Sequence, residues 1–169
     1  MHVEEIYIAA AAGEPMESMQ SIQAVDGGLA GDRYCTGRGH YSPFDVCQVT
    51  FVQAGALEAI RDRTSLDPTN GTHRRNVVVR GGDVHDLLEH RFTIGTARFE
   101  GTRRRPPCRY LEEVTGQDGL LDALADGGGG ICARVVDPGD VAVGDDITDR
   151  EDLNDFESLV ADIRDRVSR

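Results

Sequence analysis

The sequence predicts a mainly β protein, in which a barrel of strands is interrupted by a few helices. Three observations lead to this prediction. Segments of alternating or continuous apolar character recur between glycine-rich turns, helical segments interrupt them at irregular intervals, and an amphipathic stretch follows the last of them. A doubly wound parallel sheet would require helices and strands that alternate regularly, and the chain lacks that alternation.

Eight segments are predicted to form strands. Their apolar residues alternate or run continuously, as expected for strands that bury one face or both. The segments span residues 3–11, 21–25, 46–52, 76–80, 92–94, 97–100, 131–136 and 141–147.

Helices are predicted in three places. Residues 53–63 carry Ala54, Leu57 and Ile60 at helical spacing, and residues 109–125 form two short helices broken at 116–119. Residues 150–169 carry an apolar stripe opposite Asp, Glu and Arg, which predicts an amphipathic C-terminal helix. This stripe packs on its own domain or forms a dimer contact. The predicted organisation is therefore one domain, residues 1–149, followed by the helix 150–169.

The charge composition excludes some functions. The 169 residues carry a net charge of −12, and all 18 cationic residues are arginine. Without lysine, the chain cannot hold pyridoxal phosphate as a Schiff base. An acidic surface disfavours a nucleic-acid partner, and arginine in place of lysine suggests a halophilic, haloarchaeal source with a salt-rich cytoplasm.

Neither a targeting signal nor a membrane span is predicted. The apolar run at residues 6–12 is short and follows Glu4 and Glu5, where a secretory peptide would be basic. The four cysteines show no Cys-x-x-Cys pair, which predicts free thiols in a cytoplasmic protein without a membrane partner.

Cys108 has the surroundings of a reactive thiol. Three arginines and two prolines precede it, and a predicted helix follows. Cations and the amide dipoles of a helix N-terminus both stabilise a thiolate, and the prolines stiffen the approach. The alternative is a buried structural cysteine.

Two further segments contain candidate ligands for an anion. The glycine-rich bend at 27–34 ends in Asp32-Arg33, where backbone amides and a guanidinium could hold a phosphate, although such bends also simply join strands. In His73-Arg74-Arg75-Asn76, alternation along a strand would point Arg74 and Asn76 to the same side, toward a phosphorylated heterocycle. A solvated charge cluster is the alternative.

Two further groups of residues are more typical of structural roles than of a binding or catalytic site. The glycines at 127–130 lack the spacing of a nucleotide-binding loop, so they predict a flexible turn before a strand, and Cys132 is predicted to lie in the core. Cys35, His40 and Cys47 could converge on zinc, but no fourth ligand is evident.

The order of these motifs resembles the MOSC domain, the C-terminal domain of molybdenum-cofactor sulfurases. The match spans the chain from near its start to residue 147. It consists of GLAGDRY at 28–34, QVTF at 48–51, RNVVV at 75–79, the pattern from Leu88 through FxIGxAxFEG at 92–101, PC at 107–108, GGICARV at 129–135 and GD at 144–145.

The resemblance implies a MOSC-type β-barrel, like the barrel of pyruvate kinase, standing alone without a desulfurase domain. It implies that Cys108 carries sulfur as a persulfide or ligates molybdenum. It also implies that Arg74 and Asn76 contact the pterin and phosphate of the molybdenum cofactor, with Asp32 and Arg33 in a loop near the site. The family's link to pyridoxal phosphate would not be covalent here.

Three functions follow from the resemblance. With Cys108 as a molybdenum ligand, the protein would reduce N-hydroxylated compounds and would need an external flavin or iron–sulfur partner. With a Cys108 persulfide, it would transfer sulfur supplied by a separate cysteine desulfurase. A non-catalytic carrier or storage module for the molybdenum cofactor is the alternative. The protein is expected to be a monomer or a homodimer.

Overall fold

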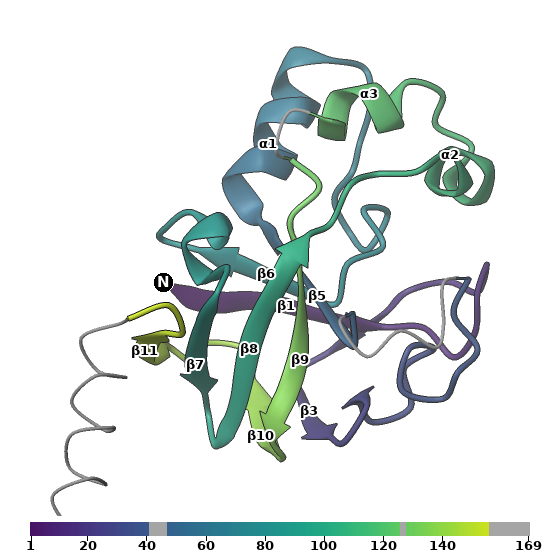
Figure 1. The fold of residues 1–169 in the computed structure, drawn as a ribbon. Helices are drawn as coiled ribbons and strands as arrows, with labels where there is room; N and C mark the ends of the chain where they lie inside the picture. Colours follow the sequence, from purple (N-terminus) through teal and green to yellow (C-terminus); the bar gives the residue numbers. More distant parts are fainter. Residues whose placement is uncertain (41–46, 126–127, 156–169) are drawn as a thin grey trace, which may run out of the picture.

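A computed structural model describes residues 1–40, 47–125 and 128–155 (Figure 1). The chain is mainly β. The strands are β1 His2–Ile8, β2 Glu17–Met19, β3 Ser21–Val25, β4 Gly28–Leu29, β5 Val49–Gln53, β6 Val77–Arg80, β7 His90–Ile94, β8 Ala97–Arg104, β9 Ile131–Asp137, β10 Gly139–Ala142 and β11 Ile147–Asp152. The helices are α1 Ala54–Arg63, α2 Arg109–Thr115, α3 Leu120–Ala125 and the short 3₁₀ turn η1 Val84–Leu87.

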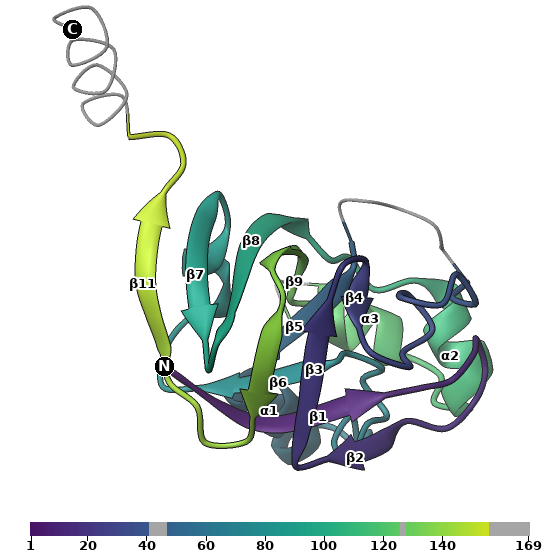
Figure 2. The ribbon, with the colours of Figure 1, turned by 90° about the horizontal axis from the view of Figure 1, so that it is seen from below.

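The strands form a curled half-barrel. Eight strands pair in the order β11-β7-β8-β9-β5-β6-β1-β2, and β10-β3-β4 forms a second sheet (Figure 2). Only β5 and β6 pair in parallel among these described strands. The turn between β10 and β11 reaches back to β1, where His2 bridges Asp146 and Val3 N–H donates to the Asp145 carbonyl at 2.9 Å. This contact curls β1 toward β11 across the sheet.

Alternation along β5 and β6 builds two apolar cores. Phe51 and Val77 face the concave side, where Phe51 meets Phe92 and Phe99 with ring centroids 5.7 and 5.8 Å apart. Val52 and Val78 face the other side and pack against α1, α2 and α3 through the buried residues Leu57, Ile60, Leu111, Leu120 and Leu124. The continuous apolar runs are therefore explained by burial on both faces.

The segment between β8 and α2 is set by local chemistry. Cys108 holds the N-cap position of α2 in an extended conformation, φ −139° and ψ 160°, after two prolines that cannot continue a helix. Gly116 ends α2 in the left-handed conformation, with φ 66°. The two short helices predicted in residues 109–125 are confirmed.

The prediction of a mainly β barrel with inserted helices is confirmed, and the barrel is a curled half-barrel. The short strands β2 and β4 were not predicted, and the predicted strand 3–11 ends at Ile8. The predicted strand 141–147 is wrong as one strand, because a turn that holds Gly144 at φ 94° separates β10 from β11. The predicted helix 150–169 begins too early, because residues 150–152 belong to β11, in which Glu151 and Asp152 pair with β7. Residues 156–169 lie outside the described part of the chain. Among the described residues, no helix is long and apolar enough to span a membrane.

The prediction of four free thiols is wrong. Cys47 and Cys132 form a disulfide, 85 residues apart in the sequence, and both are buried. The pairing of β5 with β9 brings Cys132 opposite Thr50, close to the start of β5, which places Cys47 within reach. Cys35 and Cys108 remain thiols, and the core position predicted for Cys132 is confirmed.

Reduction of the Cys47–Cys132 disulfide is expected to lower the free energy of unfolding by about 2–4 kcal/mol, because a long loop is released in the unfolded chain. Urea unfolding with and without reductant measures the change. Cys35→Ser should show the same loss on reduction, and the double variant Cys47→Ala, Cys132→Ala should be insensitive to reductant. Equal midpoints for the wild type in both conditions would contradict the disulfide.

Gly130 is expected to be intolerant of a side chain. Its φ is 80°, and a Cβ would overlap the carbonyl oxygen of Phe51. Gly119 has a φ of 90° but no atom within 4 Å of such a Cβ. Both alanine variants carry the same backbone strain, so Gly130→Ala should be less stable than Gly119→Ala by about 1–3 kcal/mol in urea unfolding, through overpacking alone. Equal stabilities would show that the close approach is absent.

Candidate functional site

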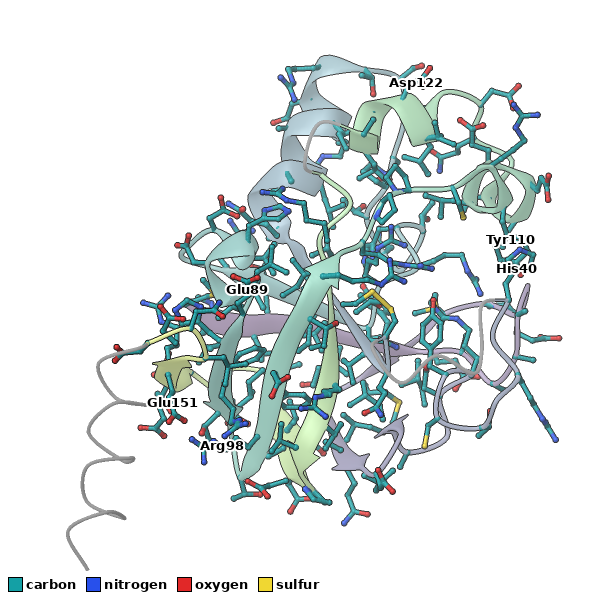
Figure 3. The ribbon with its side chains drawn as sticks, viewed as in Figure 1. His40, Glu89, Arg98, Tyr110, Asp122 and Glu151 are labelled. Atoms are coloured by element: carbon teal, nitrogen blue, oxygen red, sulfur yellow. A yellow bond between two sulfur atoms is a disulfide. The ribbon has the colours of Figure 1, made fainter. Side chains whose placement is uncertain are left out.

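An open pocket lies where three segments meet: the loop after β4, the chain before β6, and the junction of β8 with α2. Side chains far apart in the sequence line it. They include Arg33, Tyr34, Arg74, Arg75, Arg105 and Cys108. His40 and Tyr110 line it as well, and their rings stack with centroids 4.0 Å apart (Figure 3).

The four pocket arginines are buried. Their exposed fractions are between 4% and 8%, and Arg33 pairs with Asp32 at 3.1 Å. In the described part of the chain, neither Arg74 nor Arg75 forms an ion pair with a carboxylate. Buried cations are costly unless an anion compensates them, so the pocket has the electrostatics of an anion-binding site.

Arg74 is strained and incompletely bonded. Its φ is 56°, in the left-handed region that non-glycine residues seldom occupy. Nη1 donates to the Glu14 carbonyl at 2.7 Å, while the buried Nη2 has no hydrogen-bond partner among the described residues. Strain of this kind gathers at ligand sites, and the free donor is available to an acceptor in the pocket.

Arg75 is held by backbone carbonyls. Nε donates to the Gly129 carbonyl at 2.9 Å and Nη1 to the His73 carbonyl at 3.2 Å. Burial, followed by the charge of Arg105, lowers the pKa of Arg75 to about 10, while Tyr34 and Cys108 act in the opposite direction. Arg75 therefore remains charged at neutral pH and lies near both of these side chains.

His73 supports Arg75 as a neutral ring. Its Nδ1 accepts the Arg75 backbone N–H at 2.9 Å, and its ring meets Tyr7 edge-on. Burial and the charges of Arg75 and Arg33 lower the pKa of His73 to about 3. The ring therefore adds no charge to the pocket above this pH.

Asp32 shapes the loop after β4 and does not line the pocket. Its carboxylate is fully buried, with Oδ1 accepting from the Ala9 N–H and from Arg33 Nη1, and Oδ2 accepting from the Tyr34 N–H at 3.0 Å. Arg33, held in this way, donates through Nη2 to the Arg74 carbonyl at 2.9 Å. The Asp32-Arg33 pair thus joins the loop to the strained residue before β6.

Asn76 does not line the pocket, although the sequence predicts that it points to the same side as Arg74. Its Oδ1 accepts from Thr50 N–H and Oγ1, and its Nδ2 donates to the Tyr7 carbonyl at 3.1 Å. Asn76 therefore joins β5 to β1. The alternation argument does not apply, because β6 begins at Val77 and Arg74 lies outside the strand in a left-handed turn.

Cys108 is half-buried at the rim of the pocket, and its sulfur makes no capping bond to α2. Tyr34 stands in the same pocket. Burial alone would raise the pKa of Tyr34, but the charges of Arg105, Arg33 and Arg75 outweigh burial and lower this pKa. The pocket therefore offers a bound molecule one thiol, the phenols of Tyr34 and Tyr110, and several guanidinium groups.

Among the residues that the structure describes, no group of three His, Cys, Asp or Glu side chains converges in the way a metal ion would require. The zinc alternative loses Cys47 to the disulfide.

The site also contains residues that were not singled out as ligands. Arg75 and Arg105 belong to arginine runs, Tyr34 closes the glycine-rich bend, and Tyr110 follows Cys108 by two positions. Runs of arginine are usually solvated, so the sequence gives no sign that Arg74, Arg75 and Arg105 are buried.

Comparisons with known proteins identify a family and several structures of similar fold. Residues 36–148 match the MOSC domain. The YuaD protein of Bacillus subtilis has a similar crystal structure, with a TM-score of 0.72 and 23% identity over 86% of this chain and 93% of that one. YiiM of Geobacillus stearothermophilus gives a TM-score of 0.68 at 16% identity over 87% of this chain and 73% of that one.

YiiM of Escherichia coli gives a TM-score of 0.62 at 16% identity, over 89% of this chain and 71% of that one. No curated protein matches the sequence significantly. At these identities the three structures establish the fold alone, and the matched residues establish the family. With two thirds of its length matched and its half-barrel shared with these neighbours, the chain belongs to the MOSC domain family, whose members are associated with the molybdenum cofactor.

Proposed function

We propose that this protein binds the molybdenum cofactor in the arginine-lined pocket, with Cys108 as the thiolate ligand of molybdenum, and reduces N-hydroxylated compounds. One observation carries the proposal: a free thiol and four buried arginines face the same pocket. The molybdenum cofactor presents both a phosphate and a metal that accepts a thiolate, and the pocket offers a partner for each.

The donor set fits the phosphate. A guanidinium presents a planar fork of N–H groups that matches phosphate oxygens, and Arg74 Nη2 is a buried donor without a partner among the described residues. Arg33 and Arg74 are the residues expected to hold the phosphate. Asn76 would act indirectly, by fixing β5 to β1 beneath the pocket.

Cofactor binding explains more of the pocket than sulfur transfer does. A sulfur carrier needs an accessible thiol. Sulfur transfer gives no role to the buried guanidinium groups around that thiol or to the strained backbone of Arg74. A bound dianion would compensate these charges.

When bound, the cofactor supplies a metal that cycles between oxidation states two electrons apart. The chain itself offers no other redox centre besides cysteine, so electrons would come from an external flavin or iron–sulfur protein. The phosphate contacts would orient the guest, and Cys108 would fix its metal end. The proposed setting is a cytoplasmic protein of a halophile, as a monomer or a homodimer.

Cys108→Ser is expected to lose molybdenum. Removing a residue that only supports a metal ligand already weakens metal affinity about tenfold or more. Removing the ligand itself should therefore weaken molybdenum affinity at least as much. Protein made in a cofactor-competent host and purified natively is analysed for molybdenum and pterin per chain. Cys35→Ser is the matched control, since Cys35 is also a free thiol but does not line the pocket.

Other outcomes separate the competing functions. Molybdenum retained in full by Cys108→Ser would contradict ligation and favour a non-catalytic carrier of the cofactor. An added sulfur atom on Cys108 by mass spectrometry, without molybdenum, would favour sulfur transfer from a desulfurase. Bound molybdenum without reduction of N-hydroxylated compounds would also favour the carrier.

Arg74→Asn is expected to weaken retention of the pterin about 10- to 100-fold, because charge-assisted hydrogen bonds of about 1.5–3 kcal/mol are lost. Asparagine tolerates the left-handed backbone at this position, so the change removes the guanidinium without adding strain. Pterin fluorescence after oxidative release measures the effect. Arg61→Gln, on the exposed face of α1, serves as the control and should retain the wild-type content; equal content in Arg74→Asn would exclude Arg74 from the phosphate site.

A further inference from the structure

Tyr34 places a phenol hydroxyl among the cations of the pocket. Arg105 Nη2 donates to this hydroxyl oxygen at 3.3 Å, and the Arg33 guanidinium carbon lies 4.6 Å from the centre of the ring. The backbone is fixed by the Tyr34 N–H, which donates to Asp32 at 3.0 Å. Two contacts therefore orient the phenol, and a third fixes the backbone that carries it.

The hydroxyl hydrogen has no acceptor among the described residues, while its oxygen already accepts from Arg105. A phenol that accepts one bond and has a hydrogen to donate can give that hydrogen to a pocket guest. The same guanidinium groups that fix the oxygen would stabilise it as an anion after the proton has left.

We infer that Tyr34 is a catalytic residue of this pocket: its hydroxyl protonates the departing hydroxyl group of an N-hydroxylated substrate. The inference rests on the proposed function and adds the source of a proton to it. Tyr34 shares the pocket with Cys108, and both are close enough to Arg75 to influence its charge.

The step balances as R–NHOH + 2 e⁻ + 2 H⁺ → R–NH₂ + H₂O. The N–O bond breaks, the nitrogen is reduced, and the two electrons come from the external flavin or iron–sulfur donor. Tyr34 gives one proton to the departing oxygen, which leaves as water, and solvent gives the other proton to nitrogen. The tyrosinate then recovers its proton from solvent.

The neighbouring side chains suit this role less well. Arginine does not release a proton near neutral pH, and His73 is buried with its pKa lowered to about 3. The closest competitors are His40 and Tyr110, which line the pocket with their rings stacked on each other. A test must therefore compare Tyr34 with both.

The first test needs no cofactor. Ultraviolet titration of tyrosinate in the purified protein should show one group that ionises below the ordinary range near 10, and Tyr34→Phe should lose it. Tyr7→Phe is the matched control, because burial and Glu5 raise the pKa of Tyr7 to about 12 and Tyr7 lies outside the pocket lining. An early ionisation that persists in Tyr34→Phe would overturn the assignment.

The second test uses protein loaded with molybdenum. At equal molybdenum content, Tyr34→Phe should reduce an N-hydroxylated substrate about 100-fold or more slowly and should lose the fall in rate at alkaline pH, while Tyr7→Phe keeps both. Wild-type rates in Tyr34→Phe, or loss of the pH dependence only in His40→Gln or only in Tyr110→Phe, would overturn the inference and leave the proposed function intact. A wild type that holds molybdenum but reduces nothing would overturn both.

Discussion

The central physical constraint in this molecule is the burial of several guanidinium groups beside one another, of which Arg33 pairs with the buried carboxylate of Asp32. Their mutual repulsion and their desolvation oppose folding. Backbone carbonyls supply part of the compensation, since Glu14, His73, Arg74 and Gly129 all accept from pocket arginines. Because carbonyls are fixed to the chain, the backbone around the pocket has to adopt unusual conformations to present them.

One such conformation, at Arg74, and one close backbone approach, at Gly129, explain features of the sequence. Arg74 adopts a left-handed conformation, and its carbonyl meets Arg33. Gly129 accepts from Arg75 with its carbonyl, and a Cβ on Gly129 would overlap the carbonyl oxygen of Arg105. The glycines before β9, predicted to be a flexible turn, thus allow the close packing that positions two pocket arginines.

The sequence predicts much of the fold because local patterns determine it. The valines of β6 and the prolines before Cys108 act on their immediate neighbours, so strands, helices and the place of the thiol follow from periodicity and backbone chemistry. The resemblance to the MOSC domain, carried by motifs in order, is confirmed. The Cys47–Cys132 disulfide escapes prediction because it depends on the register of β5 with β9. The structural role of Asn76 could not be predicted, because a side-chain amide bonds to backbone groups as readily as to a ligand. The burial of Arg75 and Arg105 could not be predicted either, because it depends on segments that are remote in the sequence.

The crowding of guanidinium groups has a consequence for selectivity. Guanidinium forks recognise the charge and shape of an oxyanion but cannot distinguish inorganic phosphate or sulfate from a phosphate ester. Abundant small anions in a cell would therefore compete for the same donors. Discrimination must come from a second point of attachment, and the sulfur of Cys108 at the rim is the group in this pocket that a simple oxyanion cannot engage. Only a guest that carries both an anionic end and a centre attractive to thiolate gains from both contacts at once.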